Sequence, residues 1–425
     1  MILSKFITPN RRTIMRYIFI FLVFTFNLLA VDAVLTIEKD VESKTSLSII
    51  EDTNTANSTQ KHQKMFSLLL NDIKMSGHFN VDSTARRGSF DEGMIPPELH
   101  DREYILKYSY APSGTKLDVK LLHVLDNNVI FQKGYTVNAS ARYPFLAHNA
   151  IVDINNALGY DDISWMSRHI LFSKYISSRK SEVLIADYTL LFSSVIVRGG
   201  LNLFPKWANP TQSAFYYTSY NNFLPTLYRV DMASGARKKV ISSEGVMVCS
   251  DVSADGSKLL LTMAPNGQTD IYEYDVNSGS KEQLTKFRGI DVNGKYLGDE
   301  SRIAFVSDRM GSANIYTKSI GSYSVSKAAH YGANNSSCDA FGQYILYSVR
   351  EGGATNIYLG SANSSYVRAL TSNGSNQLPR FSKDGKVILY IKQNGRGNTI
   401  GYMNLATKQN SSYPMINGQI QSIDW

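Results

Sequence analysis

The stretch DVSADGSKLLLTMAPNGQTDIYEYDVNSGSKEQLT, residues 251–285, contains the pattern of short strands and turns that decides the fold. Leu259–Leu261 is a short apolar run of the kind found in covered strands. Asn266-Gly267 is a strong hairpin signal, and Ile271–Tyr274 alternates with a period of two. The stretch therefore predicts four short antiparallel strands joined by turns.

The same unit recurs along the chain at intervals of 42 to 44 residues. A period of about 40–45 residues with four strands in each repeat is typical of propeller blades. A sandwich built from unrelated hairpins is disfavoured, because it would not hold a constant period. Six copies in phase predict a six-bladed β-propeller over residues 161–425. The apolar residue that opens the third strand of each copy stands at Val183, Leu227, Ile271, Ile315, Ile357 and Ile400.

The first repeat, which begins near Trp165, contains only three candidate strands. The chain ends with QIQSIDW (Gln419–Trp425), which is similar to the inner-strand segment LNLFPKW (Leu201–Trp207) and has no repeat of its own to complete. We therefore expect residues 419–425 to form the inner strand of the first blade. Such closure removes the exposed sheet edges that promote aggregation.

Residues 1–33 have the features of a secretory signal peptide, with a basic start, the apolar run Tyr17–Ala30 and a cleavage site near Ala33. Met15 could replace Met1 as the start. An uncleaved anchor is disfavoured, because the run is shorter than the roughly 20 residues that span a bilayer. The sequence thus predicts export to an oxidising compartment. Cys249 and Cys338 are expected to be buried thiols rather than a disulfide.

Residues 34–160 follow a different pattern, which predicts a small α/β domain. Gln60–Ser76 is expected to be a helix whose buried face carries Met65, Leu69 and Ile73, with Gly77 as its cap. Strands are expected at Glu103–Tyr110, Leu117–Leu125 and Val129–Val137, and a second helix at Arg142–Leu158. The candidate polar groups of this domain are interpreted as solvated surface; they are His123, His148, Asp161 and Asp162.

Composition and motifs exclude several functions. The 425 residues carry a formal charge of +8, but no dense run of Lys and Arg indicates nucleic-acid binding. The seven His residues form no zinc motif, and no G-x-S-x-G nucleophile motif occurs. Gly289–Tyr296 nearly matches a phosphate-binding loop, yet Tyr296 replaces the required hydroxyl residue. We expect no cofactor and no metal.

The expected scaffold is a ring whose inner-strand loops project from one face. These loops are placed at Ser242–Cys249, Phe287–Asn293, Tyr331–Asp339 and Ser372–Leu378. A polar rim with a few apolar anchors, here Val246 and Met247, is what a protein-binding mouth needs. The candidate partner-binding residues are Glu244, Val246, Met247, Arg288, Asp291, Asn293, Asn334, Asn335, Asn373 and Asn376.

The alternative function is an exported propeller hydrolase or lactonase that uses acidic loop residues and a divalent metal. The acidic residues expected in the loops are Glu244, Asp251, Asp291, Asp299 and Asp339. This alternative is disfavoured, because any propeller carries polar residues in its loops.

Several motifs resemble the TolB family, the periplasmic component of the Tol–Pal cell-envelope system, over nearly the whole mature chain. Ser76–Phe79 resembles that family's "SG-x-F", Ile185–Tyr188 its "VADYDG", and Phe305–Gly311 its "FTSD-x-x-G". The helix that opens with Arg142-Tyr143 and closes at Gly159 resembles another family element. The family's "P-x-W/F-SPDG" repeat is altered here, for example to SADG at 253–256.

The resemblance implies a non-enzymatic, monomeric adaptor that supports outer-membrane integrity, with its link to peptidoglycan, and constriction during cell division. It implies that the lipoprotein Pal binds at the propeller mouth. It also implies that TolA binds the start of the mature chain, where a free strand-prone segment can extend a partner's sheet. The alternative for that segment is the first strand of the α/β domain. The segment consists of Val34, Leu35, Thr36, Ile37, Glu38 and Lys39.

Overall fold

Strands are the main secondary structure in the part of the chain that the computed structural model describes, which is residues 44–55, 60–394, 397–414 and 418–425. These residues belong to one compact unit, Ser43–Trp425. The predicted signal peptide and the Val34–Lys39 segment lie outside the described residues.

The first sheet surrounds a strand that the sequence patterns did not indicate. This strand, β1 (Thr45–Asp52), is parallel to three neighbours and is buried from Leu47 onward. The predicted strands β4, β5 and β6 follow it as an antiparallel meander. The other strands are β2 (Phe79–Val81), β3 (Arg86–Gly88), β4 (Tyr104–Tyr110), β5 (Lys116–His123) and β6 (Asn128–Thr136).

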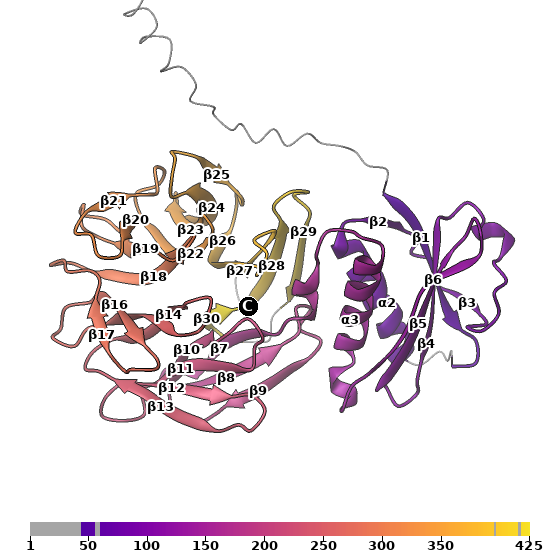
Figure 1. Ribbon diagram of the computed structural model, residues 1–425, viewed down its shortest axis with the longest axis horizontal. Coiled ribbons are helices and arrows are strands. Elements are labelled where there is room, and N and C mark those ends of the chain that lie inside the picture. Colours follow the sequence, from indigo (N-terminus) through magenta and orange to yellow (C-terminus); the bar gives the residue numbers. More distant parts are fainter. Residues whose placement is uncertain (1–43, 56–59, 395–396, 415–417) are drawn as a thin grey trace, which may run out of the picture. The chain divides into compact units, whose positions relative to one another are not determined.

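Two helices, α2 (Gln60–Ser76) and α3 (Pro144–Ala157), pack against each other and against this sheet (Figure 1). The predicted stripe Met65, Leu69 and Ile73 is at most 1% exposed, which confirms the expected buried face of α2. Gly77 ends the helix with φ +85°, a conformation that glycine adopts without strain. Short 3₁₀ helices occur at η1 (Pro97–Leu99), η2 (Ser140–Arg142) and η3 (Ser164–Ser167).

The remainder of the described chain forms six sets of four antiparallel strands, of which the last two join through one parallel contact between Thr355 and Ser375. The first three sets are β30 (Ile420–Asp424), β7 (Ile170–Ser177), β8 (Lys180–Ala186), β9 (Ser193–Val197); β10 (Asn202–Trp207), β11 (Ala214–Ser219), β12 (Thr226–Asp231), β13 (Arg237–Ser242); and β14 (Met247–Val252), β15 (Lys258–Met263), β16 (Asp270–Asp275), β17 (Lys281–Gln283).

The other three sets have the same strand order. They are β18 (Asp291–Leu297), β19 (Arg302–Ser307), β20 (Asn314–Ser319), β21 (Val325–Lys327); β22 (Asn335–Phe341), β23 (Tyr344–Glu351), β24 (Ala354–Ser361), β25 (Val367–Ala369); and β26 (Ser375–Phe381), β27 (Val387–Asn394), β28 (Gly397–Asn404), β29 (Asn410–Pro414).

The apolar residues that set the sequence period occupy the third strand of every set, and each has no exposed surface. This common placement explains the constant spacing, because the third strand packs against the neighbouring sets on both faces. The predicted class, an α/β domain followed by an all-β propeller, is confirmed.

The first set takes its inner strand from the far end of the chain. β30 pairs antiparallel with β7 (Figure 1). The hydroxyls of Ser173 and Ser422, which are 249 residues apart, share a hydrogen bond of 2.8 Å. Trp425 packs edge-on against Trp165 and Tyr402, at ring distances of 5.6 and 5.7 Å.

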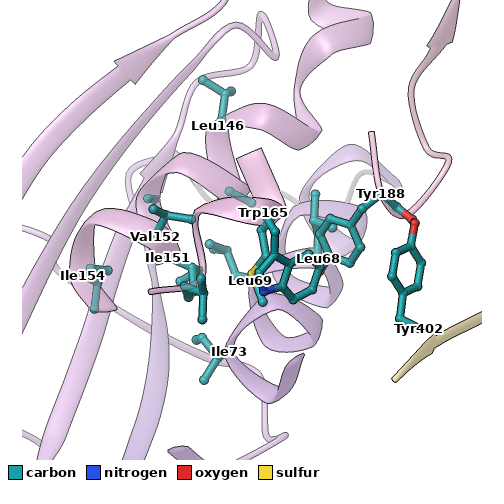
Figure 2. Packing of buried hydrophobic residues seen from close by; sticks show 14 of the residues in the cluster. Leu68, Leu69, Ile73, Leu146, Ile151, Val152, Ile154, Trp165, Tyr188 and Tyr402 are labelled. Carbon is teal, nitrogen blue, oxygen red and sulfur yellow. The ribbon is translucent and has the colours of Figure 1, made fainter. Parts of the chain in front are cut away.

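The α/β domain and the propeller share one hydrophobic core. Leu68 and Leu69 of α2 belong to the same buried cluster as Trp165, Tyr188 and Tyr402 (Figure 2). The Tyr402 hydroxyl donates a 2.8 Å hydrogen bond to the Tyr188 carbonyl, so the sixth set is tied to the turn that follows β8.

His148 corrects an expectation, because its side chain is completely buried rather than solvated. Its Nδ1 lies 2.6 Å from Asp72 of α2, and its Nε2 lies 3.2 Å from Asp187 of the propeller. A buried polar group needs such partners. The other groups do lie at the surface: Asp161 and Asp162 are exposed, and His123 is partly exposed beside Asp126.

Candidate functional site: the axis and mouth of the propeller

Each of the six inner strands places one charged side chain near the propeller axis, and the sign of the charge alternates from one strand to the next. Five of them directly follow a register shift, which is where a β-bulge re-aims a side chain. We call this set the axial ring; its members are Lys206, Asp251, Lys295, Asp339, Arg380 and Asp424.

Ion pairs link most of the axial ring. The Lys206 ammonium lies 2.9 Å from Asp424 and 3.3 Å from Asp251. The Lys295 ammonium lies 3.0 Å from Asp339 and 3.7 Å from Asp251. Lys295 is only 1% exposed, so these carboxylates are the partners that compensate for its burial.

The second oxygen of each ring aspartate accepts a main-chain hydrogen bond from the next set. Asp251 accepts from the Tyr296 N–H at 3.0 Å, Asp339 from Phe381 at 2.9 Å and Asp424 from Trp207 at 2.8 Å. Each donor is the residue that follows a ring cation. The axial ring therefore connects neighbouring sheets through both side-chain charge and backbone.

Neighbouring charges of the axial ring shift the pKa values of Lys206 and Asp339. Burial opposes the charge on Lys206, but Asp424 and Asp251 outweigh it and raise the pKa of this ammonium above its usual range. Burial also opposes ionisation of Asp339, but Lys295 and Arg380 lower the pKa of this carboxyl. Lys206 and Asp339 are consequently charged at neutral pH.

Cys249 and Cys338 lie close to the ring, in strands β14 and β22 rather than in the predicted loops. Both are buried free thiols, as expected, and burial raises the pKa of each to about 12.

Arg380 is bonded differently from the two ring lysines. Its Nε donates to the Ile423 carbonyl at 2.9 Å, and its Nη1 donates to the Pro379 carbonyl at 2.8 Å. Among the described residues, no carboxylate lies within 4.0 Å of its guanidinium, and Nη2 has no hydrogen-bond partner.

Two cavities flank the axial ring. One, of about 360 Å³, is lined by residues that precede the ring members along the chain, such as Val246, Val292 and Leu378. The other, of about 250 Å³, is lined by residues that follow it, such as Val252 and Phe341. Because both cavities include Lys206, Arg380 and Asp424, the ring lies between them. We call the first cavity the mouth vestibule.

The mouth is the end of the propeller where the inner strands begin. In an antiparallel set, the turn between the second and third strands lies at this same end. Among the mouth-loop residues that the structure describes, five apolar side chains are at least 40% exposed, and of these only Val246 was predicted. They are Phe223, Val246, Ile290, Met310 and Tyr331.

The predicted mouth residues divide into two groups. Those on the loops are exposed, namely Glu244, Val246, Arg288, Asn334 and Asn373. Those already inside an inner strand are buried or partly buried, namely Met247, Asp291, Asn293, Asn335 and Asn376. The expectation that Met247 is an exposed anchor is wrong, since its side chain has no exposed surface and packs in a core cluster.

The buried polar members of that list support the loops from below. The Asn335 side chain donates to the Tyr331 carbonyl at 2.8 Å, and Asn376 donates to the Asn373 carbonyl at 2.8 Å. Both oxygens of Asp291 lie 3.0 Å from Nη2 of Arg309. These contacts fix the loop ends that carry the exposed side chains.

The acidic residues considered for a hydrolase are not brought together at the mouth. Asp251 and Asp339 belong to inner strands and to the axial ring, not to loops. Asp299 lies in the turn between β18 and β19, at the opposite end from exposed Glu244. Within the described ranges, no group of three or more His, Cys, Asp or Glu side chains is placed to hold a metal ion.

Comparisons with known proteins all find proteins named TolB. A family profile described as the TolB beta propeller domain matches residues 166–425. The "Tol-Pal system protein TolB" of Wolinella succinogenes is 41% identical over 412 residues, which cover 94% of this chain and 97% of that protein. The protein of the same name from Campylobacter jejuni is 40% identical, with 96% and 98% covered.

The solved structures include a close match in fold. The crystal structure of TolB from Acinetobacter baumannii matches with a TM-score of 0.72 over 90% of this chain and 96% of that one. At 21% sequence identity, this likeness concerns the fold alone.

Proposed function

This chain belongs to the TolB family of the Tol–Pal system, and from that premise we propose that it is a non-enzymatic periplasmic adaptor. In this proposal, the lipoprotein Pal binds at the propeller mouth, and TolA binds the segment Val34–Lys39 at the start of the mature chain. The adaptor thereby supports outer-membrane integrity and envelope constriction during division. It works as a monomer and binds no nucleic acid.

The observation that carries the mouth assignment is the group of exposed apolar side chains on the mouth loops. Phe223 is 99% exposed, Met310 78% and Ile290 51%. Polar residues such as Glu244, Arg288 and Asn334 lie on the same set of loops. Apolar anchors within a polar rim are the usual composition of a protein-binding surface. Loop residues on a rigid scaffold are also the usual site of binding.

A non-enzymatic role is supported by the bonding of the acidic residues near the axis. Asp251, Asp339 and Asp424 are each engaged with a ring cation and with a main-chain N–H of the next set. An aspartate in such contacts is held as a structural ion, which is unlike a general acid or base tuned to neutral pH.

Binding measurements with purified Pal test the mouth assignment. Replacing Val246 and Ile290 together by Asp should weaken Pal binding by about tenfold or more, because each anchor would bring an unpaired charge into the interface. Tyr323→Asp is the matched control, since Tyr323 is fully exposed in the β20–β21 turn at the opposite end. Unchanged Pal affinity in the double variant would refute the mouth assignment.

Separate experiments test the start of the chain. We propose that residues 1–33 are removed on export and that the propeller proper comprises residues 161–425. Mass spectrometry of the periplasmic protein should give a chain that begins at Val34. Deleting Val34–Lys39 should abolish TolA binding and leave Pal binding intact; loss of both would indicate a general folding defect. Within the described residues, no helix combines the length and apolar character needed to cross a bilayer.

A further inference from the structure

The axial ring contains an imbalance that points to a ligand. Its three cations occupy equivalent positions, but the three aspartates are shared by only two of them within hydrogen-bonding or ion-pair distance. Lys206 and Lys295 each contact two carboxylates. Arg380 contacts none among the described residues and is held by two main-chain carbonyls instead.

Arg380 also lies where a partner can reach it. It lines the mouth vestibule, whose volume of about 360 Å³ falls within the range of about 300–1,000 Å³ typical of ligand sites. Much of the remaining wall is apolar and is supplied by Phe204, Val248, Val306 and Ile423. A guanidinium beside such a wall gains more from a carboxylate than it would in open water.

The residue type fits the same conclusion. A lysine ammonium is a point charge, and both ring lysines are satisfied by aspartates. Arginine presents a planar fork that can bind a carboxylate through two parallel hydrogen bonds. In Arg380, the two main-chain contacts orient the fork and leave Nη2 available.

We propose that Arg380 is the anchor for a carboxylate side chain, an Asp or Glu, that the partner bound at the mouth inserts into the vestibule. This inference rests on the proposed function, in which that partner is Pal. The partner's acidic side chain would complete the axial ring as a fourth carboxylate, while its apolar neighbours would contact Val246 and Ile290 on the mouth loops.

The primary experiment leaves this chain unchanged. Each surface Asp and Glu of Pal is replaced in turn by Asn or Gln, and the affinity for the full-length wild-type protein is measured by calorimetry. One such replacement should weaken binding by about thirtyfold or more, as expected when one member of a buried, hydrogen-bonded charge pair is removed. If every replacement changes the affinity by less than about threefold, the inference is wrong.

Variants of this chain identify the anchor. Arg380→Gln should weaken Pal binding to a similar extent, and Arg380→Lys should recover only part of the loss, because it keeps the charge without the fork. The control is Lys383→Gln, an exposed cation that lines the cavity on the other side of the ring. Melting temperatures of all variants check that the ring remains folded.

A double-mutant cycle distinguishes the binding of Pal at the mouth from the specific pairing of Arg380 with a Pal carboxylate. The Pal replacement that weakens binding to the wild type should cause no further loss with Arg380→Gln. If wild-type protein binds no Pal at all, the proposed function fails. If Pal binds normally but Arg380→Gln binds it equally well, only the carboxylate anchor is refuted.

Discussion

The Nε2 atom of His148 in the α/β domain lies 3.2 Å from a carboxylate oxygen of Asp187 in the propeller, and both side chains are completely buried. The other ring nitrogen of His148 faces Asp72 of α2 at 2.6 Å. The Tyr188 hydroxyl donates to the same Asp72 at 2.5 Å. A cation between two carboxylates thus links two helices to the turn that follows β8.

Replacing His148 by Leu should destabilise the protein by about 3–5 kcal/mol, because it leaves two buried carboxylates without a counter-charge. Urea denaturation at pH 7 measures this change. His123→Leu is the control, since His123 is partly exposed and should change stability by less than about 1 kcal/mol. Equal effects of the two variants would contradict the assigned role of His148.

The stability should also fall as the pH rises from 6.5 to 9. Burial opposes the charge on His148, but Asp72 and Asp187 outweigh it and raise the pKa of the imidazole to about 9. A raised folded-state pKa gives a stabilising contribution that is complete below pH 6.5 and lost as the pH passes through 9. The difference corresponds to roughly 3 kcal/mol.

Thermal melts at intervals between pH 6 and 9.5 check this dependence. Among the described residues, the aromatic rings in contact with His148 are those of Tyr188 and Phe145, and neither titrates in this window. His148→Leu should therefore show a much flatter profile than the wild type. A variant profile as steep as that of the wild type would assign the dependence to another group.

Breaking the axial ring should lower the free energy of unfolding by as much as removing His148 from between Asp72 and Asp187. Lys295→Met removes the cation between Asp251 and Asp339, and we expect a loss of about 3–5 kcal/mol. Denaturant unfolding measures it, with the exposed Lys383→Met as the control. Adding Asp339→Asn to Lys295→Met should recover part of the loss, because one unpaired charge disappears.

Removing residues 419–425 should abolish cooperative unfolding of the propeller. The deletion takes away the strand that pairs with β7, along with buried Ile423 and Trp425. Differential scanning calorimetry should show no sharp transition for the truncated chain. Gln419→Ala, which keeps the strand, should melt normally. A normal transition after truncation would mean that β30 is dispensable for closure.

The fold was predictable where one physical signal repeated. Residues such as Leu227 and Ile271 occupy the same position in the buried third strand of their sets. Because each set has nearly the same length, these apolar residues recur in the sequence at a nearly constant interval. Both ends of helix α2 were predicted correctly, because the apolar stripe marks its extent and Gly77 marks its end. β1 was missed: it is a parallel strand whose partners lie well apart in the sequence.

The site was less predictable, because its polar residues are satisfied by distant partners. Asn335 and Asn376 look like loop residues, yet they begin inner strands and hold the preceding loops. His148 could not be separated from a surface histidine without Asp187 beside it. The axial ring did leave a signal, since residues such as Lys206 and Asp251 alternate in sign at the blade period, but the sequence gives no ion-pair partners.

The pairing of β30 with β7 also constrains the order of events during biosynthesis. Ser173 of β7 is synthesised 249 residues before Ser422, its hydrogen-bond partner in β30. A chain emerging vectorially from a ribosome or a translocation channel therefore exposes an unpaired β7 edge until residues 420–424 arrive. Assembly of the first sheet thus waits until residues 420–424 have been made, and in the interval that edge is the natural target for a holding chaperone.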